Sequence, residues 1–102
     1  MEVTVNKKEN ISEVALAGRL DTPASIEAAP VFAKVEEEDT AGTVVLNCRE
    51  MTYISSSGLR LFLSLRKAAA AKGGKIIVKG INSDIRNVFM MTGFLNLFEI
   101  QD

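Results

Sequence analysis

A strand–helix–strand pattern is clearest between Val44 and Val78, which read VVLNCREMTYISSSGLRLFLSLRKAAAAKGGKIIV. The apolar runs at its two ends, Val44–Leu46 and Ile76–Val78, are typical of short strands buried on both faces of a sheet. From Leu59 to Ala71 the apolar residues recur at helical spacing, and Gly73 follows as a helix stop. The stretch therefore predicts two parallel strands that are joined by an amphipathic helix.

Two shorter segments before this stretch predict a hairpin. Val3 and Val5 alternate with polar neighbours, and Val14 and Leu16 do the same within residues 11–17. A period of two residues is typical of strands. Because only a short polar turn separates the two segments, we expect them to pair with each other.

A first helix is expected to begin at Thr22 and Pro23. Thr22 would cap the helix, and Pro23 would occupy the first turn, where its missing N–H is tolerated. Pro30 removes an intrahelical donor, so we expect a kink or a local break near residues 28–30. Acidic side chains are unfavourable at a helix C-terminus, so we expect the helix to end before the acidic run 36–39. The apolar residues at helical spacing in this segment are Ile26, Ala29 and Ala33.

The C-terminal part predicts a third helix and a last short strand. Asn82 to Asp84 provide cap residues, Ile85, Val88 and Phe89 follow at helical spacing, and Gly93 ends the helix. Residues 95–100 are expected to form the last strand. We therefore predict an α/β fold with a single domain over residues 1–102, built on a mixed, mostly parallel sheet of about five strands with three or four helices.

Composition excludes several classes of function. The 102 residues carry 12 Lys and Arg against 13 Asp and Glu, a formal net charge of −1, which argues against holding nucleic acid through bulk charge. No apolar run is long enough to cross a membrane, and no signal peptide is visible, so we expect a cytoplasmic protein. Cys48 is the only cysteine and histidine is absent, which excludes an internal disulfide, His-dependent catalysis and His-ligated zinc. We expect no cofactor, no metal and no enzymatic activity.

Three consecutive hydroxyls stand between the central strand and the central helix. Ser55, Ser56 and Ser57 fall at the cap and first-turn positions, next to the unpaired N–H groups of the helix. Capping alone accounts for serines at such positions. The second interpretation is a phosphoacceptor, because a phosphoryl group at a helix N-terminus meets free N–H donors and a favourable dipole.

The order of these pieces resembles the STAS domain of anti-sigma-factor antagonists. The resemblance covers nearly the whole chain, from about Val3 to Phe98, and its specificity lies in the joint order of several segments. These segments are Gly18–Asp21, Val44–Asn47, Met51–Leu59, Gly74–Val78 and Ile85–Leu95.

By this resemblance the protein is a bacterial transcription regulator instead of an enzyme. Family members bind an anti-sigma factor that is also a serine kinase, and this binding frees the sigma factor. Phosphorylation breaks the complex, and a serine phosphatase restores it. The family motif usually reads Asp-Ser-Ser/Thr-Gly-Leu with the acceptor directly after the aspartate, which implies Ser56 as the phosphorylated residue. The implied partner-binding residues, in loops at one end of the sheet, are Asp21, Thr22, Ser55, Ser57, Gly58, Leu59 and Arg60.

One position departs from the family motif. Ser55 stands where the aspartate is usual, which leaves Ser55 and Ser57 open as alternative acceptors. The alternative function is a STAS scaffold subunit of a larger assembly, for example a lipid-transport complex, with no phosphorylation cycle.

Overall fold

The computed structural model describes all 102 residues, and its elements follow the predicted order. The strands β1 (Glu2–Lys8) and β2 (Ile11–Leu20) form the expected hairpin. The elements that follow are α1 (Thr22–Glu38), β3 (Thr43–Ile54), α2 (Ser56–Lys72), β4 (Lys75–Lys79), α3 (Ser83–Thr92), the 3₁₀ helix η1 (Phe94–Asn96) and β5 (Glu99–Gln101). The α/β class, the five strands and the three α-helices are confirmed, and the last strand is shorter than expected because η1 takes its first part.

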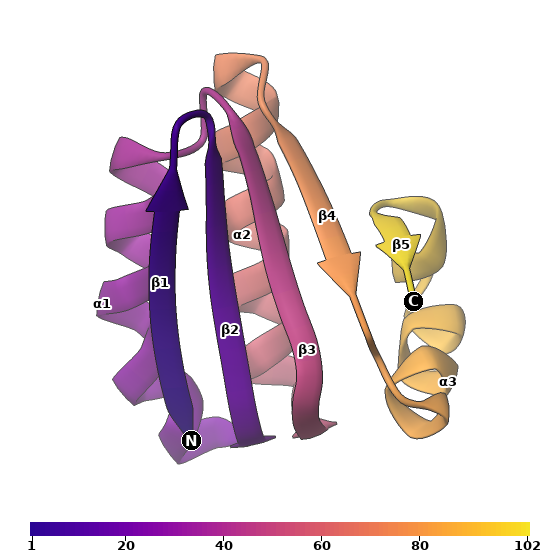
Figure 1. The fold of residues 1–102 in the computed structure, drawn as a ribbon. Coiled ribbons are helices and arrows are strands. Elements are labelled where there is room, and N and C mark those ends of the chain that lie inside the picture. The colour runs from indigo at the N-terminus through magenta and orange to yellow at the C-terminus, as the bar shows by residue number, and fades with distance from the viewer.

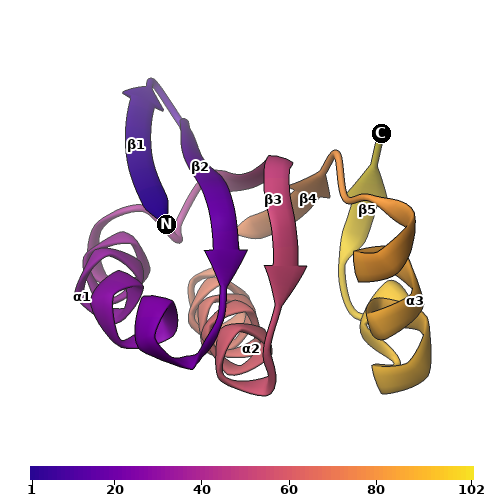
Figure 2. The ribbon, with the colours of Figure 1, turned by 90° about the horizontal axis from the view of Figure 1, so that it is seen from below.

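The five strands lie in the order β1-β2-β3-β4-β5, with β1 antiparallel to β2 and all other neighbours parallel. Crossovers between parallel strands share one hand. Since the strand order never reverses, α1, α2 and α3 all lie on the same face of the sheet (Figure 2). Figure 1 views the sheet from its other, uncovered face. None of these helices is long and apolar enough to span a membrane.

The prediction that the central strands are buried on both faces is wrong. Along β3, Val44 and Leu46 are buried, whereas Val45 between them is only half-buried. In β4, Ile77 is half-buried in the same way. Because helices cover only one face, alternate side chains of each strand point toward the uncovered face.

The core between the sheet and the helices is organised around Phe62 of α2. Its ring stacks on Phe32 of α1, with ring centroids 6.0 Å apart, and meets the ring of Phe89 of α3 edge-on at 6.2 Å. Both arrangements are favourable for aromatic rings. One side chain thus fixes all three helices relative to one another.

The start of α1 differs from the prediction, and the helix has no break at Pro30. The helix is capped by Asp21 instead of Thr22, because the Asp21 carboxylate accepts a hydrogen bond from the N–H of Ala24 at 3.0 Å. Thr22 is the first helical residue, and Pro23 lies in the first turn as expected. The helix continues through Pro30 without a break. Since Pro30 is exposed, water can reach the carbonyl that loses its donor.

The buried side of α1 also differs from the expected one. Ile26 is 72% exposed, whereas Phe32 and Val35 are buried. These two side chains carry more apolar area than the alanines of the expected side, so burying them contributes more free energy. Helical spacing alone left the choice of side open.

The C-terminus of α1 includes most of the acidic run, contrary to the prediction. The ammonium of Lys7 in β1 donates to the Glu38 carboxylate at 2.9 Å and lies 3.5 Å from that of Asp39. The ammonium of Lys72 in α2 donates to the carbonyl oxygen of Glu36 and to that of the next residue. Two cations that are distant in sequence therefore offset the unfavourable charge at this helix end.

Candidate functional site

The parallel pairing of β2 and β3 brings the two predicted loops together. Leu20 is the register partner of Ile54, and the N–H of Ser55 donates to the carbonyl of Leu20 at 2.9 Å. The loop that begins at Asp21 and the serines that begin at Ser55 therefore lie side by side. In Figure 1 both are found at the lower edge of the sheet, where β2 and β3 end.

Asp21 and Thr22 have different positions in this site. Asp21 is half-buried, and one of its carboxylate oxygens is used to cap α1. Thr22, next to it, is exposed. Of this pair, Thr22 presents the freer side chain to a partner.

The three serines differ in how their hydroxyls are used. Ser55 is the N-cap of α2, and its hydroxyl accepts a hydrogen bond from the N–H of Gly58 at 3.2 Å. Ser55 and Ser57 are half-buried, whereas Ser56 is exposed, and the Ser56 hydroxyl makes no hydrogen bond within the chain. The helix begins at Ser56, three residues before Leu59, where the apolar helical pattern begins. The hydroxyls hence occupy the cap and first turn as predicted, and Ser56 is the accessible one.

Gly58 and Leu59 lie beneath the serines and are buried. A Cβ atom at Gly58 would stand 2.9 Å from side-chain atoms of Leu20 and Ile54, so glycine lets α2 approach the ends of both strands. Leu59 belongs to the hydrophobic core. These two predicted residues hold the serine segment in place, and both are buried beneath it.

Arg60 is exposed and lies one helical turn after Ser56. Residues four apart on a helix are neighbours on its surface. The Arg60 guanidinium takes part in none of the ion pairs of the chain. It is therefore free to bind an anionic group placed on Ser56, and guanidinium matches phosphate geometry well.

Two further residues at this edge were missed in the sequence. Arg19 of β2 and Tyr53 of β3 are register partners, and the Arg19 guanidinium lies 4.3 Å above the centre of the Tyr53 ring. Tyr53 is 40% exposed. The pair lines an open pocket of about 220 Å³ together with Asp84 and Val88 of α3. A register shift between Gly18, whose φ is +104°, and Arg19 brings this pair together. A glycine within a strand is a signal of such a bulge, but it does not say which residues then pair.

Cys48 carries no function at this site. The side chain is fully buried in β3, and burial raises the pKa of its thiol to about 12. The thiolate, which is the reactive form, is therefore almost absent at neutral pH. Cys48 is therefore a small packed side chain of the hydrophobic core.

The amino-acid sequence is similar to that of known proteins. A model of the family described as "STAS domain" matches residues 2–102. BtrV of Bordetella bronchiseptica, which is named as an anti-sigma factor antagonist, is 27% identical over 100 residues, covering 98% of this chain and 85% of BtrV. An anti-sigma-B factor antagonist of Staphylococcus aureus is 22% identical over 102 residues, covering 100% of this chain and 94% of the relative.

Solved structures share the same fold. The anti-sigma factor antagonist SpoIIAA in its unphosphorylated form has a TM-score of 0.78 and 19% identity, covering 99% of this chain and 88% of the other. The phosphorylated form of SpoIIAA from Bacillus has a TM-score of 0.76 and 19% identity, covering 97% of this chain and 90% of the other. The helices and strands described above are thus those of a fold that has been solved in both phosphorylation states of another protein.

Proposed function

The chain belongs to the STAS domain family, and we propose that it is an anti-sigma factor antagonist whose partner binding ends when Ser56 is phosphorylated. The proposed partner is an anti-sigma factor with serine kinase activity, and a serine phosphatase reverses the modification. The names of the two relatives and of SpoIIAA support this role. In this scheme the protein works in the cytoplasm and regulates transcription without binding nucleic acid and without catalysing a reaction.

The observation that carries the proposal is the contrast between Ser55 and Ser56. The Ser55 hydroxyl is engaged in capping α2, whereas the Ser56 hydroxyl is exposed and unbonded. A kinase must reach an accessible hydroxyl whose modification leaves the fold intact. Ser56 meets both conditions, and phosphorylation of Ser55 would remove a helix cap.

In the free protein the fold tolerates a phosphoryl group on Ser56. The group adds about −1.5 to −2 charge at pH 7. At the first position of α2 it meets the positive end of the helix dipole, which is favourable by roughly 0.3–1 kcal/mol. The first turn of α2 contains no acidic residue, and Arg60 lies one turn away on the same side. We therefore expect phosphorylation to leave the stability of the domain nearly unchanged.

In the complex the same group is unfavourable. A partner that covers Ser56 removes water from the phosphoryl group and from the Asp21 carboxylate in the adjacent loop, so the repulsion between the two groups is screened less than in the free protein. Arg60 supplies one positive charge against about −1.5 to −2 on the phosphoryl group, so part of the negative charge is buried without a matching partner, which costs several kcal/mol. Each 1.4 kcal/mol corresponds to about a tenfold change in affinity. The effect in the complex exceeds the effect in the free protein, so phosphorylation releases the partner without unfolding the domain.

A scaffold subunit without a phosphorylation cycle is the second candidate function. It is favoured by Ser55, which occupies the position where the family motif has an aspartate. If that aspartate presents the acceptor hydroxyl to the kinase, its absence lowers the rate of phosphorylation. The exposed edge formed by Thr22, Ser56 and Arg60 would then serve a partner in a permanent assembly.

The test is a phosphorylation assay with the candidate anti-sigma factor and ATP, followed by mass spectrometry to locate the phosphate. We expect one phosphate, on Ser56, in the wild-type chain and in the control variant Ser57→Ala, and no phosphate in Ser56→Ala. Stoichiometric phosphorylation of Ser56→Ala would move the acceptor to Ser55 or Ser57. Tight binding of the candidate without any phosphorylation would support the scaffold function instead.

A further inference from the structure

The strand β1 forms a free edge of the sheet. It pairs with β2 on one side only, and no other element lies beyond it (Figure 2). Lys8 and Ile11 are partners across a two-residue turn, so the backbone groups of Lys8 point toward β2. The backbone N–H and C=O groups of Val3, Val5 and Lys7 therefore point away from β2. Such an edge is a template for another strand.

We propose that β1 pairs antiparallel with β1 of a second copy of this chain, with Val5 opposite Val5 at the two-fold axis. In this register Val3 faces Lys7 of the other copy, so the outward backbone groups of both strands meet. All seven residues of β1 take part, because Glu2 then faces Lys8 and Thr4 faces Asn6. The result is one continuous ten-stranded sheet. This inference is independent of the proposed function.

Charge complementarity argues for a second copy and for this register. Glu2 and Lys8 are both exposed, and neither takes part in an ion pair within the chain. In the proposed pairing each Glu2 lies opposite Lys8 of the other copy, and the two-fold axis makes this pair twice. Opposite charges directly across a strand pair are stabilising. A shift by two residues would place Glu2 opposite Asn6 or Lys8 opposite Thr4, and would shorten the pairing.

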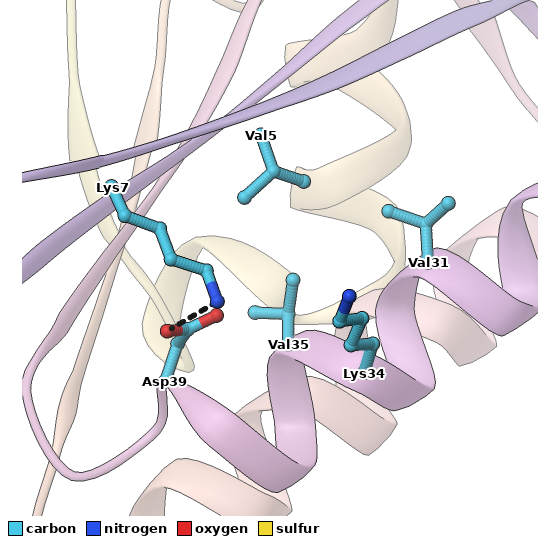
Figure 3. A pocket seen from close by; sticks show the side chains of 6 residues that line it. All are labelled: Val5, Lys7, Val31, Lys34, Val35 and Asp39. Atoms are coloured by element: carbon cyan, nitrogen blue, oxygen red, sulfur yellow. Dashed lines mark ion pairs between the residues drawn. The ribbon is translucent and has the colours of Figure 1, made fainter.

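The face of β1 that points toward α1 is also suited to this contact. Figure 3 shows Val5 directed toward Val31 and Val35 across a groove of about 420 Å³ between β1 and α1. On the same face the Lys7 ammonium is bent back onto Asp39 of its own chain. A lysine that projects from an edge strand hinders pairing, but Lys7 is held away from the edge. The Val5 side chain of the second copy would pack beside Val5 at the mouth of this groove, next to the part of its lining that valines form.

The test is sedimentation equilibrium of the purified chain from about 10 μM to about 1 mM, the range in which a small interface dissociates. We expect the average mass to rise from the monomer value of 11.1 kDa toward twice that value. The variants Glu2→Lys and Lys8→Glu each replace two attractive pairs by two repulsive ones. Each should weaken the dimer by about tenfold or more, whereas the control Lys67→Glu on the exposed side of α2 should not.

Two combinations make the test specific for this register. The double variant Glu2→Lys/Lys8→Glu restores both attractive pairs, so its dimer should be as stable as that of the wild type. An equimolar mixture of the two single variants should form a heterodimer, because each lysine then meets a glutamate. A chain that stays monomeric throughout the concentration range would overturn the proposal. A dimer that is indifferent to these charges would overturn it as well, since it would use another surface.

Discussion

At the end of the sheet where β3 and β4 begin, polar side chains donate to carbonyl oxygens of α1. At the end where β2 and β3 finish, Asp21 and Ser55 cap helices, whereas Ser56 and Arg60 face solvent. We name the first the closed end (residues 36–42 and 72–75) and the second the open end (residues 19–22 and 53–60). At the closed end Lys72 donates to two carbonyl oxygens of α1, and Thr40 donates to the carbonyl of Glu36 at 2.7 Å. At the open end the hydroxyl of Ser56 and the guanidinium of Arg60 have no such partners.

This difference separates groups that hold the fold from groups that are free to act. A polar group that already bonds to its own chain must break that bond before it binds a partner. A free group on a rigid helix start makes a new bond at little cost. The two ends are therefore expected to respond differently to substitution, in stability at the closed end and in partner affinity at the open end.

The largest effect on stability is expected at Gly74 of the closed end. A Cβ atom there would lie 1.8 Å from the carbonyl oxygen of Thr40, so Gly74→Ala must displace backbone and should lower the free energy of unfolding by about 3 kcal/mol or more. The control is Gly73→Ala. Gly73 has a φ of +74° but no atom within 4 Å of an added Cβ, so the loss should be only about 1–2 kcal/mol. Urea unfolding measures both, and equal losses would contradict the close packing at Gly74.

A smaller effect distinguishes the serines of the open end. Ser55→Ala removes the cap of α2 and should lower the free energy of unfolding by about 1 kcal/mol. Ser56→Ala removes an exposed, unbonded hydroxyl and should change it by less than about 0.5 kcal/mol. Chemical denaturation of the two variants side by side is sufficient. A larger loss for Ser56→Ala would show that Ser56 is a structural residue.

The smallest effect is expected from Glu38 at the closed end, because its pair with Lys7 is exposed. The hydrogen bond from Lys7 lowers the pKa of the Glu38 carboxyl below its usual range. The folded-state pKa is below the unfolded one, so the stabilisation is present above the unfolded pKa and is lost as the pH falls through the folded pKa. Wild type should therefore be slightly more stable than Glu38→Gln at pH 7, and this difference should shrink as the pH is lowered toward about 3.

Thermal unfolding between these pH values measures this difference. The control is Glu37→Gln, which removes an exposed carboxylate that is in no ion pair. It should show no such pH dependence. If the difference in stability between wild type and Glu38→Gln grows as the pH falls, the pair with Lys7 does not stabilise the fold.

Local patterns in the sequence predicted most of the fold. The alternation around Val14, the caps at Ser55 and Asn82 and the glycine stops at Gly73 and Gly93 are short-range signals, and the structure has them. The end of α1 was predicted wrongly, because the cations that support its acidic residues come from Lys7 and Lys72, in other elements. No pattern within α1 contains that information.

The candidate site shows the same limit. That the hydroxyls lie at the cap and first turn of α2 follows from the order of strand, serines and helix. The Ser55 hydroxyl is bonded and the Ser56 hydroxyl is free because the helix begins at Ser56 and not one residue earlier or later. The sequence left that choice open. The Arg19–Tyr53 pair needs the register shift between β2 and β3, and for that reason only the structure reveals it.

The central claim is that Ser56 lies in the partner interface and that negative charge there disrupts binding. Calorimetric titration of the candidate anti-sigma factor with Ser56→Asp tests it most directly, with Ser64→Asp on the exposed side of the same helix as the matched control. We expect Ser56→Asp to weaken binding by about 100-fold and Ser64→Asp by less than about threefold, with both variants folded. Binding of Ser56→Asp as tight as that of the wild type would contradict the account.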